Sequence, residues 1–239
     1  FDEATNEELE EAFLAVATDV RMFGDSMAFD TANDTEYLTS SYTGPIQFGF
    51  ARSLNKVEVA HHGKTSVLAA SSEDQQNIGG NMYTEHRLPY ALFAGHAVVN
   101  EHSAEDTLLS EDDVELATRA LWEGTHRLNS SSKMGIEPRV LLRVTYTEEA
   151  SHIGDLHREL ELACDPEESF DLRDVGEAAI EVDDALASLD RYSDDIDLIS
   201  GQIDRRVRFQ IGGETRDPAG FITAIENTVG ESRTELTTV

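Results

Sequence analysis

The hydrophobic pattern of this chain changes between the two-residue period of strands and the longer period of helices. Apolar and polar residues alternate from Pro45 to Val59, which predicts a strand. Its buried face would hold Ile46, Phe48 and Phe50. A second alternating segment, from Arg139 to Tyr146, predicts another strand.

The region between these two segments contains the signals of a long hairpin. Residues 65–70 and 82–100 are expected to be extended. The polar stretch 71–81 lies between them and includes Gly79-Gly80, a pair that favours a turn. This order predicts a hairpin over about residues 65–87.

Helix signals lie on both sides of this region. Thr5-Asn6-Glu7-Glu8 has the order of a capping box and predicts a helix to about Ala17. Ser110 begins a second helix that ends near Leu128, with Val114, Ala117, Leu121 and Trp122 expected on its buried face. Asp217-Pro218 begins a third, to about Val229.

Two further elements are expected in the last third of the chain. They are a helix over residues 175–190 and a strand over residues 203–211. Helices and strands are mixed along the whole chain without a regular strand–helix–strand alternation. The fold class expected is therefore α+β.

Composition adds a large negative charge to this picture. The 239 residues include 48 acidic and 18 basic residues, for a net charge of −30. The chain is 39% hydrophobic and periodic, so we expect it to fold, with the acid forming a surface adapted to a cytoplasm of molar salt. The longest apolar run, Tyr90 to Val99, is too short to cross a membrane. Cys164 is the single cysteine, which excludes an internal disulfide.

The acid is unevenly distributed. Residues 40–147 carry nine basic and 13 acidic residues and are nearly neutral beside the acidic segments 1–39 and 148–239. Within them, residues 117–147 have a net charge of +3. In so acidic a chain, a locally positive segment is where we expect an anionic partner to bind.

Sequence motifs for catalysis or metal binding are weak. His61-His62 lacks the further ligands and the spacing of a zinc site, and a polar strand end explains it better. The chain has no G-x-S-x-G elbow, no P-loop and no G-x-G-x-x-G. Carboxylates are too abundant to single out an acid–base pair. We therefore expect no catalytic residue, no metal and no cofactor.

The loop Ser130 to Gly135 offers a different chemistry. Small hydroxyl residues with one lysine and one glycine can contact a phosphate through hydroxyl groups and backbone N–H groups. A flexible surface loop is the alternative explanation. Arg127, Lys133 and Arg139 bracket the loop and favour an anion site, whereas Arg52 and Lys56 could be ordinary solvent-facing charges.

Several of these segments, in this order, resemble the Cas-seven family, the repeated subunits that hold the guide RNA (crRNA) in type I CRISPR surveillance complexes. The resemblance rests first on residues 43–55, TGPIQFGFARSLN. The type I-B branch is similar in residues 88–93 (LPYALF), 99–101 (VNE), 121–124 (LWEG), 132–135 (SKMG), 138–139 (PR) and 153–155 (IGD). The family usually opens with a strand and a basic region that are missing here, so the chain is expected to be the later part of a longer protein.

The resemblance implies a fold and a set of partners. It implies an RRM-like (ferredoxin-like) core with large insertions, forming one domain over residues 1–239, with a protruding thumb hairpin at about 65–87 and an acidic part at about 148–239. The implied partners are crRNA, target DNA through the guide, copies of the same chain stacked head to tail, and other Cascade subunits. The expected location is the cytoplasm, without membrane contact.

The resemblance also implies site residues. Arg21, Arg52, Lys56, Lys133 and Arg139 would contact phosphates, with Ser131 and Ser132 assisting through hydroxyl or backbone donors. Leu68 and Met82 would wedge against bases from the thumb, although packing within the hairpin would explain them equally well.

Two other functions stay open at this point. Related type III subunits cut RNA with a loop aspartate, and Asp74 lies in the expected thumb, although acidic residues are common throughout the chain. The second alternative is an acidic domain that binds other proteins. The non-catalytic RNA-binding function agrees best with the near-neutral region and its motifs.

The acidic surface predicts a dependence on salt. At molar salt the Debye length falls to about 3 Å, so repulsion between carboxylates is screened. In dilute buffer we expect the protein to lose its near-UV circular dichroism and its compact hydrodynamic size. A protein that keeps both in low salt would contradict the interpretation of the acid as salt adaptation.

Overall fold

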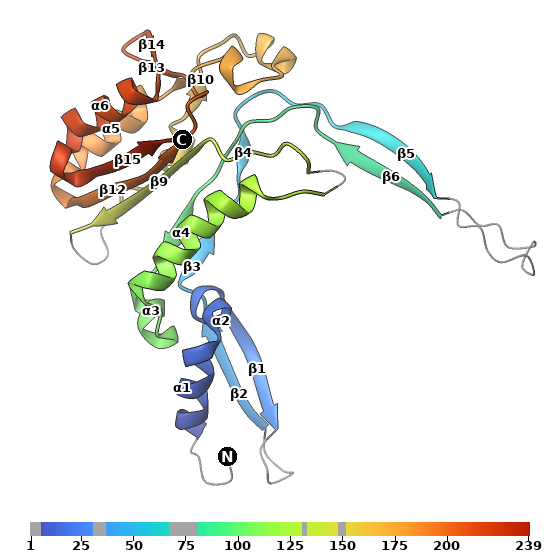
Figure 1. Ribbon diagram of the computed structural model, residues 1–239, viewed down its shortest axis with the longest axis vertical. Coiled ribbons are helices and arrows are strands. Elements are labelled where there is room, and N and C mark those ends of the chain that lie inside the picture. Colours follow the sequence, from blue (N-terminus) through green and yellow to red (C-terminus); the bar gives the residue numbers. More distant parts are fainter. Residues whose placement is uncertain (1–5, 31–36, 67–80, 131–132, 148–151) are drawn as a thin grey trace, which may run out of the picture.

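The computed structural model describes residues 6–30, 37–66, 81–130, 133–147 and 152–239. Over these residues the chain is α+β, as the sequence predicts. Figure 1 shows a C-terminal core of sheet and helices, an N-terminal arm, and a hairpin that projects away from both. The predicted single domain with a thumb stays a prediction.

The C-terminal core is built on a sheet with the strand order β15-β12-β9. The central strand β12 pairs antiparallel with β9 and parallel with β15. A bulge between Ile196 and Leu198 shifts the strand by one residue, so that Ile196 and Ile199 both face the core. The bounds are β9 (Val140–Tyr146), β12 (Ile196–Ile203) and β15 (Thr234–Thr238).

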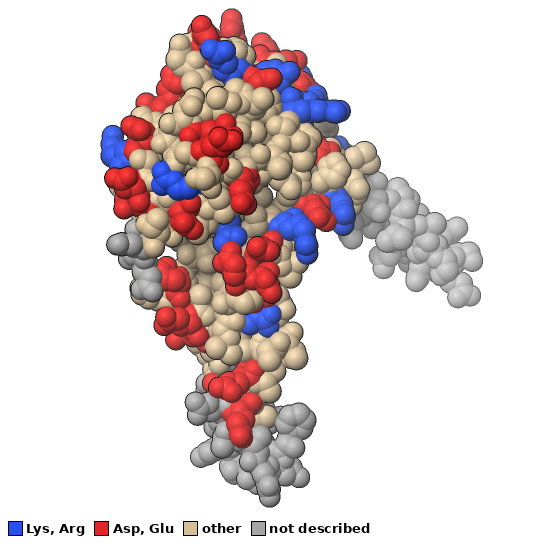
Figure 2. Space-filling model, turned by 60° about the vertical axis from the view of Figure 1, so that its left-hand side comes forward, with Lys and Arg blue, Asp and Glu red and all other residues tan. Residues whose placement is uncertain are grey.

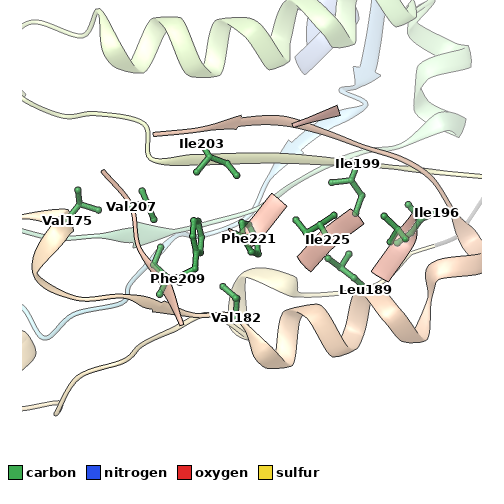
Figure 3. Packing of buried hydrophobic residues seen from close by; sticks show 12 residues of the cluster. Val175, Val182, Leu189, Ile196, Ile199, Ile203, Val207, Phe209, Phe221 and Ile225 are labelled. Carbon is green, nitrogen blue, oxygen red and sulfur yellow. The ribbon is translucent and has the colours of Figure 1, made fainter. Parts of the chain in front are cut away.

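Two helices cover this sheet, α5 (Asp183–Arg191) and α6 (Pro218–Val229). The Asp217 side chain accepts a hydrogen bond from the Gly220 N–H at 2.9 Å, and Pro218 occupies the first turn, as predicted. From α6, Phe221 and Ile225 pack on the buried isoleucines of β12 (Figure 3). This cluster is the main hydrophobic core among the described residues.

Short elements frame the core. A second sheet has the order β10-β11-β13-β14. The 3₁₀ turns η1 to η3 lie before and after β10, whereas η4 and η5 lead from α5 and α6 into the core strands β12 and β15. The bounds are β10 (Glu161–Leu162), β11 (Ile180–Glu181), β13 (Phe209–Ile211), β14 (Glu214–Arg216), η1 (Leu156–Arg158), η2 (Glu168–Asp171), η3 (Val175–Glu177), η4 (Ser193–Asp195) and η5 (Glu231–Arg233).

The single helix predicted over residues 175–190 is therefore wrong. The segment begins with η3, continues as β11 and becomes helical only in α5. The strand predicted over residues 203–211 is also wrong, because β12 ends at Ile203 and β13 begins at Phe209. Both corrections arise from sheet pairing between distant segments, since β11 pairs with β13 across the chain.

The long strand predicted from Pro45 to Val59 is interrupted. Residues 46–48 pair with residues 97–99, and residues 52–53 pair with residues 93–94. The bend falls at Gly49, where a Cβ would lie 2.1 Å from the His96 ring, so only glycine fits. Phe48 and Phe50 are exposed instead of buried. The bounds are β3 (Ile46–Phe48), β4 (Arg52–Ser53), β7 (Phe93–Ala94) and β8 (Ala97–Val99).

The hairpin is present where its residues are described. Strands β5 (Ala60–Ser66) and β6 (Asn81–Arg87) pair antiparallel from Ala60 opposite Arg87 to Ser66 opposite Asn81. Its first strand therefore begins five residues before the predicted boundary at residue 65. Residues 67–80 lie outside the described residues. In Figure 1 the hairpin reaches away from the rest of the chain.

The N-terminal arm combines two helices with a strand pair. Its elements are α1 (Asn6–Val16), α2 (Thr18–Phe23), β1 (Gly24–Asp30) and β2 (Tyr37–Thr43). The predicted first helix is confirmed, and the Tyr42 hydroxyl donates to its Glu10 carboxylate at 3.1 Å.

Two more helices join this arm to the core. They are α3 (Glu101–Thr107) and α4 (Glu111–His126). The predicted start of α4 is confirmed, because Ser110 and Asp113 form its capping box. Of its predicted buried face Val114 is buried, whereas Leu121 is 39% exposed beside a groove. Among the described residues, no helix has the length and apolar character needed to cross a membrane.

Candidate nucleic-acid interface

A pocket of about 240 Å³ lies at the root of the β5–β6 hairpin. It is formed where the hairpin leaves the core, by residues before β5, residues after β6 and residues from the segment around η2. Two cations and two aromatic rings are among its lining residues, which are Lys56, Val57, Glu58, Ala60, Pro89, Tyr90, Phe170 and Arg173. Of these residues the sequence indicates only three, namely Lys56 as a predicted phosphate contact and Pro89 and Tyr90 within the LPYALF motif.

Lys56 lies at the mouth of the pocket. Its Nζ is 2.9 Å from both carboxylate oxygens of Glu167, and its side chain is 53% exposed. An ion pair this exposed contributes at most about 1 kcal/mol, so a phosphate can replace Glu167 as the partner of Lys56. The Lys56 backbone N–H donates to the Ser169 hydroxyl at 3.0 Å, which fixes the chain at this point.

Aromatic rings and a second cation complete the pocket. Arg173 uses Nη1 to hold the carbonyls of Phe170 and Leu172, at 2.9 and 2.6 Å. Burial raises the pKa of Tyr90, so its hydroxyl stays protonated and can donate a hydrogen bond. Aromatic faces beside cations are suited to unstacked bases and their phosphates.

Arg52 joins this region to the core. Its Nη2 donates to the carbonyls of Arg158 at 3.1 Å and Leu160 at 2.6 Å. Its Nε and Nη1 make no hydrogen bond within the described part of the chain, and the residue is exposed. Arg52 therefore has a structural role and still has N–H groups for a ligand. Nearby, Asn55 is buried and accepts from the Leu92 N–H at 2.8 Å.

Arg139 is mostly buried and forms an ion pair with Asp204. A second pair, Arg206 with Asp174, lies beside it, and the charges of both arginines act on the Tyr90 hydroxyl. Arg139 is thus near Tyr90, which lines the pocket, but is not itself a lining residue. A phosphate contact by Arg139 stays a prediction, since it requires the Asp204 carboxylate to be displaced.

Lys133 has an exposed side chain without an ion-pair partner in the described part of the chain. In Figure 1 its loop, which follows α4, projects on the same side as the hairpin. Ser131, Ser132 and Leu68 lie outside the described residues. Met82 is on β6, opposite Thr65. The roles predicted for these residues stay predictions.

Arg21 has a different environment. Its Nε and Nη2 hold the Asp113 carboxylate at 2.9 and 2.7 Å. Its remaining donors bond to the carbonyls of Leu14 and Ala15 and to the Thr18 hydroxyl. All five N–H groups are used, and the ion pair is largely shielded from solvent. Arg21 therefore joins α1 and α2 to α4, and the phosphate contact predicted for it stays a prediction, which would require these bonds to be replaced.

Two histidines and an aspartate, His96, His157 and Asp155, form a cluster near Arg52. The His96 and His157 rings stack with centroids 4.2 Å apart and planes 18° apart. Burial is the main cause that lowers the pKa of His157, and the charge of the neighbouring His96 lowers it further. Asp155 lies beside them. The sequence does not indicate this cluster, because the three residues are separated along the chain and match no metal-binding motif.

The surface around these sites is mixed in charge. Figure 2 shows acidic side chains scattered over the visible face, with lysines and arginines in smaller groups among them. Many of the basic groups are paired with a carboxylate, as Lys56 and Arg139 are. Diffuse positive potential is therefore absent from this face, and any anion must be held by short-range contacts.

Comparison with known proteins gives a consistent result. The sequence profile of the family described as CRISPR-associated protein Cas7 matches residues 2–183. A protein of that name from Haloferax volcanii is 36% identical over 218 residues, which cover 86% of this chain. The match covers 63% of the relative, so the chain spans less than two thirds of its length.

The Arg21–Asp113 pair predicts a test of stability. Removing one partner of a shielded ion pair leaves the other charge unpaired, so Asp113→Asn should lower the free energy of unfolding at neutral pH by about 3 kcal/mol. Denaturant titration in high salt measures this. The exposed neighbour Asp112 provides the control, Asp112→Asn, with a change of at most about 0.5 kcal/mol.

The same pair predicts a pH dependence. Hydrogen bonds from Arg21 hold the pKa of Asp113 well below its usual range. The stabilisation is therefore complete above the unfolded-state pKa of about 3.9 and is lost as the pH falls below it. Asp113→Asn should lose part of this acid sensitivity. If wild type and variant lose stability equally on acidification, the assignment is wrong.

Proposed function

Because the chain belongs to the family of CRISPR-associated protein Cas7, we propose that it binds CRISPR guide RNA as the repeated backbone subunit of a type I interference complex. Binding would be independent of the RNA sequence, since base pairing of the guide reads the target. The observation that carries this proposal is the family match together with a pocket of cations and aromatic rings at the hairpin root.

The contacts proposed for the RNA follow from the geometry of the described residues. Lys56 and Lys133 are both exposed. A phosphate can replace Glu167 beside Lys56, and Lys133 has no ion-pair partner among the described residues, so both lysines are proposed to hold phosphates. Arg52 would add its unused N–H groups. Tyr90 and Phe170 would stack on a base that enters the pocket. Ser131, Ser132, Leu68 and Met82 keep the roles proposed from the family resemblance.

A net charge of −30 is unusual for a protein that binds RNA. In molar salt, however, attraction driven by counterion release is strongly weakened for any protein. Affinity then depends on short-range hydrogen bonds, arginine forks and stacking, which screening affects less. The hairpin-root pocket supplies groups of this kind, and the acid elsewhere is proposed to keep the protein soluble in such salt.

The assembly is also a proposal. The core would be RRM-like, and the β5–β6 hairpin would be the thumb that covers the guide RNA held by the next copy. Copies stacked head to tail make a heterologous interface that extends into an open helix. Target DNA would join through the guide, beside other Cascade subunits in the cytoplasm.

RNA retention tests the proposal. Protein purified in high salt should carry RNA of one guide-like length. Lys56→Ala with Lys133→Ala should reduce RNA affinity by roughly a hundredfold or more, because each removes a charge-assisted contact of at least about 1.5 kcal/mol, which is about tenfold in affinity. Gel shift and quantified bound RNA measure the effect.

Arg216→Ala is the matched control for this pair. Arg216 is also 53% exposed and paired with a glutamate, Glu214, but lies on β14 away from the lining residues of the pocket. Its replacement should leave RNA binding unchanged. Full RNA retention by the double lysine variant would overturn the site assignment, and equal loss in the Arg216 control would show a general charge effect.

The proposed binding is non-catalytic. A target RNA paired to the guide should stay intact when Mg²⁺ is added, and Asp74→Ala should behave as the wild type. Electrophoresis of labelled target over time measures this. Metal-dependent cutting that disappears in Asp74→Ala would favour an RNA-cleaving relative instead.

A further inference from the structure

Three side chains from two distant segments converge beside the Arg52 segment. His96 comes from the turn between β7 and β8, and Asp155 and His157 come from the start of η1. One ligand atom from each, a ring nitrogen or a carboxylate oxygen, lies within 4.8 Å of the other two. Two imidazoles and a carboxylate are a donor set that binds divalent transition metals.

The two histidines have buried nitrogens without partners. Nδ1 of His96 and Nδ1 of His157 make no hydrogen bond within the described part of the chain, and both atoms are shielded from solvent. His157 as a whole is only 7% exposed. Buried polar atoms are nearly always paired, because leaving one unpaired costs about 1–3 kcal/mol. Two such atoms in one cluster indicate that a ligand belongs there.

The surrounding structure holds the rings in place. His96 is packed between the His157 ring and Gly49, where even a Cβ atom would lie 2.1 Å from the His96 Cε1. The main chain at residue 49 thus approaches the imidazole as closely as it can. Packing of this kind limits the rotamers of His96 and lowers the entropy lost on binding an ion.

We propose that His96, Asp155 and His157 form a binding site for a divalent transition metal ion, with Zn²⁺ as the ion that suits the donors best. Zinc binds imidazole nitrogen and carboxylate oxygen at about 2.0–2.2 Å. Stacked rings direct their nitrogens side by side, so one ring turns about its side-chain torsions when the ion binds. Three protein ligands leave one position for water or a phosphate oxygen.

The metal would join two parts of the fold. His96 lies between β7 and β8, which pair with residues 46–53, whereas Asp155 and His157 lie at η1, between the core strands β9 and β12 along the chain. The Arg52 guanidinium contacts the carbonyls of the same turn, at Arg158 and Leu160. A bound ion would thus stiffen the junction from which the hairpin projects. This site does not depend on the proposed RNA binding.

One neighbouring charge competes with the ion. Arg158 Nε lies 3.1 Å from the Asp155 carboxylate, in an exposed ion pair. Binding of a cation requires this carboxylate to leave Arg158. Arg158→Ala should therefore strengthen metal binding. If Arg158 only stabilised the fold, the same substitution would leave metal binding unchanged or weaken it.

The test uses the whole chain after removal of metals with a chelator. Zn²⁺ titrated against a chromophoric chelator should bind at one equivalent per chain, and Zn²⁺ should raise the melting temperature. His96→Ala and Asp155→Asn should each weaken binding at least about tenfold, and Arg158→Ala should tighten it. Asp155 is exposed, so its variant should fold even if a histidine variant does not.

Two control variants locate the site. His102→Ala removes an exposed histidine outside the cluster, and His61→Ala disrupts a second histidine pair, His61 with His86, whose ring centroids are 4.7 Å apart. Both should bind Zn²⁺ as the wild type does. The proposal is overturned if Asp155→Asn keeps full affinity, if binding is lost in His61→Ala instead, or if the wild type binds no Zn²⁺.

Discussion

The arrangement of this molecule depends on the hydrogen bonds that join residues 52–56 to the segment 157–169. Arg52 holds two carbonyls of the turn at Arg158 and Leu160, and the Lys56 N–H bonds to the Ser169 hydroxyl. Between them, Asn55 is buried against Leu92. These contacts connect the near-neutral middle of the chain to the acidic C-terminal segment 148–239. They hold Lys56, which lines the pocket at the hairpin root, against the segment that contributes Phe170 to the same pocket.

The same junction bears on how so acidic a protein would bind the proposed RNA. The core around Ile196, Ile199 and Phe221 is apolar and belongs to the C-terminal segment 148–239, which carries half of the chain's acidic residues. The middle region contributes fewer carboxylates, and two of its cations, Arg52 and Lys56, lie at the junction. Short contacts in one place can then replace the broad positive surface that an RNA-binding protein uses at low salt.

Elements with local signals could be predicted from the sequence, and those fixed by distant partners could not. The caps at Ser110 and Asp217 mark α4 and α6 because a cap involves only residues within one turn. The continuous strand predicted from Pro45 is wrong because its pairing partners lie in a segment about 50 residues away. The His96 ring that packs against Gly49 comes from the same segment. The alternating pattern there contains no sign of this contact.

The candidate site was predictable to a similar extent. Lys56 and Lys133 stand out as cations in an acidic chain, and the structure leaves both exposed. Phe170 and Arg173, more than 100 residues later, carry no motif that could bring them to Lys56. The ion pair of Arg21 could not be predicted for the same reason, since its partner Asp113 is 92 residues away. Charge indicates which residues are available, but only the fold decides which are already paired.

The most direct test of this account is photo-crosslinking of the bound RNA to the protein, with the linked peptides identified by mass spectrometry. Crosslinks are expected at Tyr90 and Phe170, in the pocket at the hairpin root. Crosslinks confined to peptides away from residues 52–60, 89–90 and 170–173, or a protein that carries no RNA in high salt, would contradict it.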